Sequence, residues 1–362
     1  MKVQVPKKSL ADALQHVERI VPTRSSNPGL NLLRIDLLGD GLRLSGTNLD
    51  IDIEATVSAD VRGDGSLAVP AQVFGQVVRA LPGDVVDMNV EDSELHVSAN
   101  GFATRLQLVD PENAPNPSFP DRYTGKLPAI ELANALGSVR YAAAVAEYQA
   151  IFRGVKLELS EQASRAVATD GFRLAYYDLD AVSGLDAELI VPARSVDEIV
   201  KLLADGEVEL DASEARLALK CVDVRLNVKL MEGTFPDYRR VIPATFPVVI
   251  TLDAERLHEA VSRVAVMADK TANNRVDLFV KDGTLQITAE GAYGRSQEGL
   301  EVQQEGSDAE MALAYNAKYL TDALAPLNGM LRASFSGSTT PSVLADPDDP
   351  RYLAMVVPLR TA

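Results

Sequence analysis

The chain has 362 residues, of which 46% are hydrophobic and 24% are charged. This composition argues against disorder, and the length allows two or three domains that each bury a core. The formal net charge of −17 does not exclude nucleic acid as a partner, because such contact depends on where the Lys and Arg residues lie.

Two further features bear on the compartment. No apolar run is long enough to span a bilayer, and the opening residues Met1–Lys8 lack the apolar stretch of a secretory signal. The single cysteine, Cys221, lies in a strand-like run and is expected to be a small buried hydrophobe. We therefore expect a cytoplasmic protein without disulfides and without a membrane partner.

The first predicted helix runs from about Ser9 to Val21, with apolar residues at helical spacing. The same pattern returns twice. Leu10, Leu14 and Val17 recur as Leu132, Leu136 and Val139, and then as Leu257, Val261 and Val264, at offsets of 122 and 125 residues. A repeat of this length indicates three copies of one module.

A β-hairpin is predicted next in each copy. Asp40-Gly41 in the first copy and Asp282-Gly283 in the third lie between alternating apolar runs, which is a strong hairpin signal. In the second copy the run 154–169 fills this place with a longer, more polar turn. The hairpin therefore belongs to the repeated module.

A second helix follows in each copy, opening at Val69, Val191 and Tyr315 with spacings of 122 and 124 residues. Further strand-like runs close each module. Linkers rich in Pro or Asn are expected near Asp110–Gly125 and Pro243–Val249. The sequence thus predicts an α+β fold of three domains, each with two helices on one face of antiparallel sheets and six to eight strands. The expected domains are residues 1–120, 121–245 and 246–362.

The helix faces turned away from the apolar stripes carry Lys, Arg and Gln, together with several acids. For one helix alone, a solvated face of mixed charge is the simplest interpretation. Six helices that repeat the feature would instead line a common concave wall if the modules join side by side. Arg79, Arg194 and Lys201 occupy such positions.

The sequence contains little that indicates catalysis. His16, His96 and His258 are not at metal-ligand spacing, and no Gly-rich phosphate loop is present. The acidic run Ala345–Pro350 contains two prolines and is expected to be a solvated loop. We expect a binding or scaffolding protein that is not an enzyme, with no catalytic residue, no metal and no cofactor.

Three motifs carry a resemblance to a known family: A-T-D-G-F-R-L-A at Ala168–Ala175, V-P-A-R at Val191–Arg194 and E-G-T-F-P-D-Y-R-R-V-I-P at Glu232–Pro243. With them the chain resembles the bacterial DNA polymerase III β subunit over its whole length. The resemblance implies three DNA-clamp domains per chain and a closed ring formed by a head-to-tail homodimer. Helices would line the inside of this ring, around duplex DNA held without sequence preference.

The implied function is that of a sliding clamp, which encircles DNA and confers processivity on replication. Its implied partners are the DNA polymerase III α subunit, the clamp loader and other replication or repair proteins with a clamp-binding motif. Two alternatives stay open: a peptide-binding adaptor that never forms a ring, and a metabolic enzyme on a triplicated scaffold. A monomer in solution would favour the adaptor, and a cluster of titratable residues at a module junction would favour the enzyme.

The resemblance also implies a peptide-binding pocket between the second and third domains. One part of it would comprise Thr169, Gly171, Phe172, Arg173, Leu174, Pro236, Arg240, Val241, Val356 and Leu359. The adjoining groove would comprise Phe152, Ser342, Met355, Val357, Pro358 and Arg360. From the residues alone, Val241, Val356 and Leu359 would read as ordinary core.

Two further surfaces follow from the resemblance. Arg24 matches a position at which the family contacts DNA, and Arg79, Arg194 and Lys201 would line the channel by their place in the repeat. At the dimer interface, Leu106 and Leu108 would meet Val266 and Met267, and Arg105 would face the acids Glu298 and Glu301. The alternation of R-L-Q-L suits an edge strand that pairs across a dimer.

The sequence departs from the family pattern in three places. Phe172 stands where His is frequent, and Val357 stands where Met usually precedes the proline. The chain also continues to Thr361 and Ala362 beyond Arg360. A bulkier Phe and a stiffer Val predict a different peptide preference at an unchanged location.

Overall fold

The computed structural model describes residues 1–146 and 150–360. The first third of the chain contains helices α1 (Lys7–Ile20) and α2 (Ala71–Ala80). Its strands are β1 (Lys2–Pro6), β2 (Leu32–Leu38), β3 (Gly41–Thr47), β4 (Ile51–Ser58), β5 (Asp60–Arg62), β6 (Gly65–Pro70), β7 (Val85–Glu91), β8 (Glu94–Ala99) and β9 (Phe102–Gln107).

The second third repeats this order with helices α3 (Ala129–Arg140) and α4 (Ala193–Leu202). Its strands are β10 (Gly125–Pro128), β11 (Gly154–Leu159), β12 (Ser164–Thr169), β13 (Arg173–Leu179), β14 (Ala187–Pro192), β15 (Glu207–Ala212), β16 (Arg216–Cys221) and β17 (Val224–Lys229). A single 3₁₀ turn, η4 (Tyr238–Val241), lies in the segment that leads to the last third.

The last third contains helices α5 (Ala254–Val264) and α6 (Ala317–Leu324) and the 3₁₀ turn η5 (Ala265–Met267). Its strands are β18 (Val248–Asp253), β19 (Arg275–Lys281), β20 (Thr284–Gly291), β21 (Gly294–Glu301), β22 (Gln303–Glu305), β23 (Glu310–Asn316), β24 (Met330–Phe335), β25 (Ser342–Ala345) and β26 (Tyr352–Val356). The described residues thus give nine, eight and nine strands per copy, where six to eight were expected. The sequence missed short edge strands such as β5 and β22.

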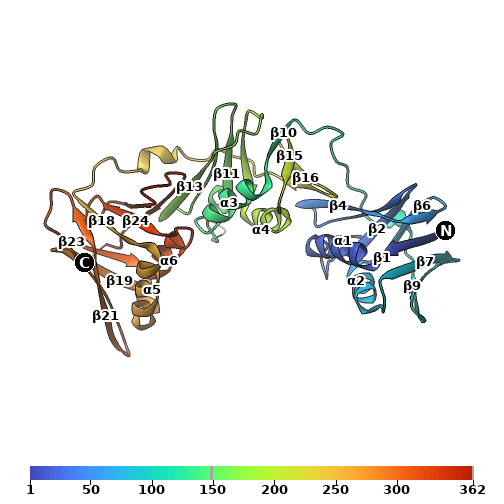
Figure 1. The fold of residues 1–362 in the computed structure, drawn as a ribbon, viewed down its shortest axis with the longest axis horizontal. Helices are drawn as coiled ribbons and strands as arrows, with labels where there is room; N and C mark the ends of the chain where they lie inside the picture. The colour runs from blue at the N-terminus through green and yellow to red at the C-terminus, as the bar shows by residue number, and fades with distance from the viewer. Residues whose placement is uncertain (147–149, 361–362) are drawn as a thin grey trace. The chain divides into compact units, whose positions relative to one another are not determined.

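The helices form where the apolar periodicity placed them. Leu10, Leu14 and Val17 of α1 are at most 1% exposed, so the repeated stripe is the buried face of the helix. Helix α1 packs on β3 and β4 and against α2, and α5 packs on β20 and β21 and against α6 (Figure 1). The expected packing of helices on one face of a sheet is confirmed for these pairs.

The predicted hairpins are also present. β2 and β3 pair across the turn at Gly39 and Asp40, and β19 and β20 pair across Asp282 and Gly283. Asp282 and Gly283 have φ values of 49° and 73°. Two successive residues with positive φ give a turn whose twist matches that of the paired strands.

Of the four sheets that the described residues form, two join strands from different copies of the repeat. The eight-stranded sheet has the order β10-β15-β16-β17-β4-β3-β2-β6, and the nine-stranded sheet has the order β14-β11-β12-β13-β26-β25-β24-β18-β22. The first joins the copies through β17 and β4, and the second through β13 and β26. The strands of the second copy are therefore divided between two sheets, which the sequence period did not indicate.

The contacts divide the chain into two compact units. One comprises Met1–Ala133, Ser183–Leu185 and Asp197–Leu230, and the other comprises Asn134–Val182, Asp186–Val196 and Met231–Ala362. The division therefore runs through the second copy of the repeat, because the two halves of that copy belong to different sheets.

The structure also bears on membrane spans, metal sites and the single cysteine. Within residues 1–146 and 150–360, no helix is long and apolar enough to cross a membrane, and no group of three or more His, Cys, Asp or Glu residues could hold a metal ion. Cys221 is half-buried, and burial raises the pKa of its thiol to about 11. The thiol is therefore protonated at neutral pH and unreactive.

Candidate functional site

The turn between β12 and β13 is locked by side chains that bond its own backbone. Thr169 Oγ1 donates to the carbonyl of Arg173 (2.7 Å) and accepts from the amide of Gly171 (3.1 Å). Asp170 Oδ1 accepts from the amides of Phe172 and Arg173, at 2.9 and 3.0 Å. Gly171 has a φ of 86°, a conformation that other residues adopt only with strain. The turn holds Phe172 at the surface, with 55% of the residue exposed.

The last strand of the chain lies beside this turn. In the pairing of β13 with β26, Arg173 is opposite Val356 and Leu174 is opposite Met355. The pairing continues one step further, because the amide of Val357 donates to the carbonyl of Phe172 (2.9 Å). The turn and the C-terminal segment therefore lie side by side at one end of two neighbouring strands.

The segment before β18 packs against these two strands. Phe235 and Tyr238 are buried and form an apolar cluster with Leu174 and Met355. The ring of Phe152 meets that of Phe235 edge-on, with centroids 6.3 Å apart. The aromatic residues of this segment thus anchor it on the sheet.

A polar network also holds the same segment. Tyr238 donates its hydroxyl to Glu158 Oε2 (3.0 Å), and Arg239 Nη2 lies 2.6 Å from the same carboxylate. Burial raises the pKa of the Tyr238 hydroxyl, which keeps it a donor. Burial alone would raise the pKa of Glu158, but Lys156, 2.8 Å away, and Tyr238 bring that pKa below its ordinary value.

The four arginine and lysine residues expected to face DNA divide into two pairs. Arg24 and Arg194 are exposed, and neither forms an ion pair with another described residue. Arg79 Nη1 lies 2.6 Å from Glu18 Oε2. Lys201 Nζ lies 2.7 Å from a carboxylate one turn away on the same helix. The charges of Arg79 and Lys201 are therefore balanced within the chain.

Two sheet edges carry the residues expected at the subunit interface. β9 is an edge of the five-stranded sheet β5-β1-β7-β8-β9, and β21 is an edge of the four-stranded sheet β21-β20-β19-β23. Leu106 and Leu108 are half-buried. Val266 and Met267 in η5, which contacts β21, are 77% and 37% exposed. Free edges with exposed apolar neighbours are the surfaces that pair with another chain.

The two acids expected opposite Arg105 differ in their surroundings. Glu298 is engaged by Arg263, whose Nη2 and Nε lie 2.8 and 3.1 Å from its carboxylate oxygens. This hydrogen bonding lowers the pKa of Glu298. Glu301 is exposed and has no ion pair with any described residue. Arg105 is 67% exposed in its side chain and lies 3.7 Å from Glu94.

Comparison with known proteins covers nearly the whole chain. Residues 1–116 match the model of the DNA polymerase III β subunit N-terminal domain, residues 126–237 that of its central domain, and residues 239–360 that of its C-terminal domain.

The chain belongs to the DNA polymerase III β subunit family.

Relatives that match at full length are named beta sliding clamp. That of Bacillus subtilis is 26% identical over 379 residues, covering 100% of both chains, and that of Caulobacter vibrioides is 29% identical over 376 residues, covering 99% of this chain and 100% of its own. Among solved structures, a sliding clamp from Pseudomonas aeruginosa bound to griselimycin superposes with a TM-score of 0.94 at 26% identity, covering 100% of each chain. The resemblance seen in the sequence is confirmed.

The residues of this chain that were expected in the peptide pocket fall into three groups by exposure. Those buried in the structure are Thr169, Arg173, Leu174, Ser342, Met355, Val356 and Pro358. Those of intermediate exposure are Phe152, Val357 and Leu359. Those exposed are Gly171, Phe172, Pro236, Arg240, Val241 and Arg360. Thr361 and Ala362 lie outside the described residues.

Exposure decides what a ligand could touch here. Val241 is 50% exposed, so the reading of this residue as ordinary core does not apply. Val356 is 1% exposed and supports the sheet from within. The side chain of Arg240 is 84% exposed and pairs with Asp237 at 2.8 Å. Only the exposed residues of this set are open to contact from outside, and the buried ones pack beneath the surface.

Sequence reasoning missed the residues that hold Arg173. Asp322 in α6 lies 2.6 Å from the Arg173 guanidinium, and the rings of Tyr141 and Tyr319 flank it. The sequence of α6 does not indicate that Asp322 contacts Arg173, because acidic residues are common on helix surfaces.

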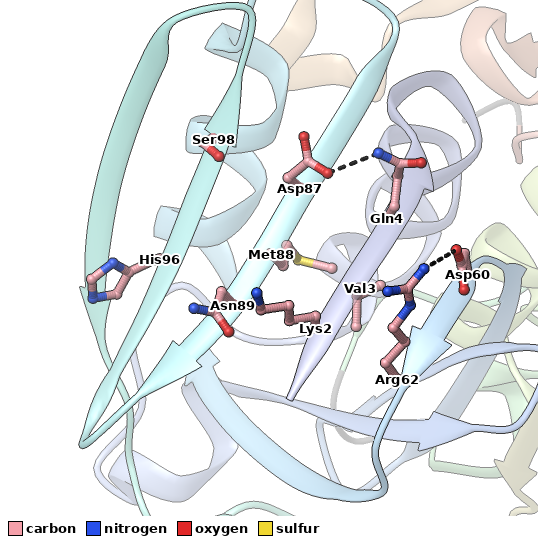
Figure 2. A pocket seen from close by; sticks show the side chains of 10 residues that line it. All are labelled: Lys2, Val3, Gln4, Asp60, Arg62, Asp87, Met88, Asn89, His96 and Ser98. Atoms are coloured by element: carbon pink, nitrogen blue, oxygen red, sulfur yellow. Dashed lines mark hydrogen bonds and ion pairs between the residues drawn. The ribbon is translucent and has the colours of Figure 1, made fainter.

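A separate hollow of about 350 Å³ lies on the five-stranded sheet. Figure 2 shows Lys2, Gln4, Asp87 and His96 among its lining side chains. Gln4 donates to Asp87 (2.9 Å). This hollow contains none of the residues that the sequence singled out for DNA, peptide or subunit contact.

Proposed function

We propose that the protein is a DNA sliding clamp of the bacterial replication machinery. Two copies would close a ring around duplex DNA and tether the replicative polymerase, so that synthesis continues without dissociation. The observation that carries the proposal is the match of three successive segments, which together cover nearly the whole chain, to the three domains of the β subunit family. Such a ring holds DNA by enclosing it and needs no catalytic residue.

The proposed channel contacts follow from the unpaired cations. Arg24 and Arg194 are exposed and offer their full charge to phosphates, whereas Arg79 and Lys201 share theirs with acids. Weak attraction that is independent of sequence suits a ring that must slide, because tight phosphate contacts would hold it in place. The net charge of −17 would keep DNA away from the rest of the surface.

The proposed peptide groove is formed by the 169–174 turn, the C-terminal segment and η4. Phe172 and Val241 expose apolar surface there, and Arg240 and Arg360 expose charge. An apolar anchor supplies affinity and charged groups at the rim fix the register of a bound peptide. The proposed ligands are short apolar segments of the polymerase III α subunit, the clamp loader and other replication or repair proteins.

The proposed subunit interface pairs β9 of one protomer with β21 of its partner. Leu106 lies opposite the buried Leu95, so it belongs to the covered face of its sheet, and Arg105 belongs to the other face. Glu298 lies opposite the buried Ile287 and meets α5 through Arg263. Glu301 lies on the opposite face of β21 from Glu298. We therefore assign Glu301, and not Glu298, as the acid that Arg105 meets.

We also propose the domain limits 1–120, 121–245 and 246–362 and a cytoplasmic location. The limits are supported by the family matches, which end at residues 116 and 237 and resume at 126 and 239. A location in the cytoplasm is where a bacterial replication clamp would meet chromosomal DNA.

The decisive test is topological. The protein is loaded onto nicked circular DNA with its clamp loader, and retention is followed by gel filtration before and after the circle is cut. Retention on the circle and loss from the linear form supports the proposal. Equal retention on both, or a solution mass of one 38.9 kDa chain at working concentration, would favour the adaptor that never encircles DNA.

A further inference from the structure

We propose that Asp322 of α6 is a positioning residue for the peptide groove: through Arg173 it ties the turn 169–172 to the helix. The inference deepens the groove proposed above and rests on it. It adds to the groove a residue that no ligand needs to touch.

The side chain of Arg173 is buried and makes its contacts with other residues of the chain. Its side chain is 7% exposed, with Nε 3.0 Å from Asp170 Oδ2 and Nη1 2.6 Å from Asp322 Oδ2. The guanidinium carbon lies 4.5 Å from the ring centroid of Tyr319 and 5.3 Å from that of Tyr141. A guanidinium held by two carboxylates between two rings is fixed in place. Arg173 therefore contributes to the groove through its neighbours.

The ion pair and the turn share one carboxylate. Asp170 Oδ2 accepts a hydrogen bond from the Arg173 guanidinium, while Asp170 Oδ1 accepts hydrogen bonds from the amides of Phe172 and Arg173. Asp322 is thus connected, through Arg173 and Asp170, to the backbone amide of Phe172. A shift of Asp322 would move the exposed wall of the groove.

The helix that carries Asp322 is itself anchored beside β26. The hydroxyl of Tyr352 donates to the carbonyl of Ala323 (2.9 Å) and lies 2.9 Å from the hydroxyl of Tyr141. Burial raises the pKa of both tyrosines, so both hydroxyls keep their protons. Helix α6 is therefore a fixed support rather than a loose surface helix.

The repeat supplies an internal comparison. In the first copy, Thr47 Oγ1 donates to the carbonyl of Ile51 (3.0 Å) and accepts from the amide of Leu49 (2.9 Å). Asn48 Oδ1 accepts from the amides of Asp50 and Ile51, at 3.0 and 2.8 Å. These hydrogen bonds reproduce those of the 169–173 turn. The ion pair within the turn does not recur, because Asn48 stands in place of Asp170 and Ile51 in place of Arg173. Thr47 Oγ1 also lies 2.7 Å from Asp52 Oδ1, and Asp52 pairs with Arg216 outside the turn.

The turn can therefore form without an ion pair between its own residues, so the turn conformation alone does not explain the pair in the second copy. A buried pair adds little net stability, since removing the charges from water offsets their attraction, but it can fix one arrangement among several. Only the charged turn lies at the proposed groove. Because the ion pair occurs in the turn at the groove and not in its first-copy counterpart, we infer that it holds the 169–172 turn in place against α6.

The test uses full-length protein with Asp322→Asn and, as a matched control, Lys318→Ala. Lys318 pairs with the same Asp322 carboxylate at 3.0 Å but is 69% exposed in its side chain, so its loss should change little. Amide hydrogen exchange is measured for the segments 169–174 and 47–52. Binding of a fluorescent peptide that copies an apolar clamp-binding segment of the polymerase α subunit is measured by polarisation.

With Asp322→Asn we expect exchange in 169–174 to rise about tenfold and peptide affinity to fall at least about fivefold. Exchange in 47–52 should stay unchanged, and Lys318→Ala should change neither quantity. Asp322→Glu should restore part of both losses, because it returns the charge.

Unchanged exchange in 169–174, or an equal rise in both turns, would overturn the proposal, as would faster exchange in 169–174 with unchanged peptide affinity. If the unmodified protein binds no peptide while Asp322→Asn still accelerates exchange in 169–174 alone, the tether stands and the groove assignment fails. The two failures are thus separable.

Discussion

Leu49 and Gly171 occupy the same place in the repeated turn, and both have positive φ, at 77° and 86°. Glycine adopts this conformation freely, but a leucine there brings its Cβ too close to the backbone. Leu49 is also 63% exposed, so no buried contact offsets the strain. The first copy therefore keeps the turn at a cost that the second copy avoids.

Replacing this leucine should stabilise the protein. We expect Leu49→Gly to raise the free energy of unfolding by about 1 kcal/mol, because the strain of the left-handed conformation is released. Gly171→Ala should do the reverse by a similar amount. The measurement is the denaturation midpoint of the full chain, and a lower midpoint for Leu49→Gly would show that the leucine makes a contact which outweighs the strain.

The repeats, the hairpins and the helices could be predicted because their signals are local. The period that aligns Leu10 with Leu132 marks helices, and Asp282-Gly283 marks a turn. The pairing of β4 with β17 and of β13 with β26 could not be predicted this way, since it joins strands from different copies. The same holds for Asp322, whose partner lies 149 residues away in the sequence.

The location of the proposed peptide groove rests on motif resemblance, and the division of its residues into buried and exposed comes from the structure. Leu174 and Met355 could not be told apart from Phe172 and Val241 by residue type. Burial separates them, because the sheet pairing turns the first two inward.

The exposed residues of the groove should carry its affinity. Arg240→Ala and Val241→Ala are each expected to weaken peptide binding by about tenfold, because both side chains are exposed on η4, in the segment whose Phe235 and Tyr238 pack against Leu174 and Met355. The unfolding midpoint should change little, and calorimetric titration with a clamp-binding peptide is the measurement. Removal of the whole segment 355–362 is a poorer test, because it deletes part of β26, which pairs with β13 and β25.

The two classes of channel cation should behave differently. Charge reversal at Arg24 or Arg194 is expected to shorten retention on circular DNA several-fold, since each removes an unpaired positive charge. Reversal at Arg79 should have a smaller effect on DNA and a larger one on folding, because it places an acid beside Glu18. Retention times at two salt concentrations provide the comparison, and equal loss for all three variants would contradict the division.

The assignment at the subunit interface is tested by exchanging charges. Glu301→Arg should weaken the dimer by about tenfold because it opposes Arg105 of the partner protomer, and the double variant with Arg105→Glu should recover much of the loss. Glu298→Gln serves as the control, since this residue pairs with Arg263 in its own chain. Analytical ultracentrifugation gives the dimer affinity. Weakening by Glu298→Gln as large as that by Glu301→Arg would place the contact on the other face of β21.

The carboxylate beneath η4 predicts a pH dependence. The folded protein holds the pKa of Glu158 below its ordinary value of 4.5 through Lys156 and Tyr238, against the effect of burial. A carboxyl with a lowered folded-state pKa contributes stability that is fully present above its unfolded pKa and is lost as the pH falls through the folded pKa. The loss should therefore appear only below about pH 4.5.

Glu158→Gln should remove this part of the acid sensitivity. The variant is expected to melt below the unmodified protein at pH 7, because it loses an ion pair, and the difference should narrow as the pH falls below 4. Glu161 is an exposed acid just after the end of β11, and Glu161→Gln is the matched control. It should melt as the unmodified protein does both at pH 7 and below pH 4. A gap between Glu158→Gln and the unmodified protein that stays constant from pH 7 to pH 3.5 would mean that Glu158 acts only through packing and not through its charge.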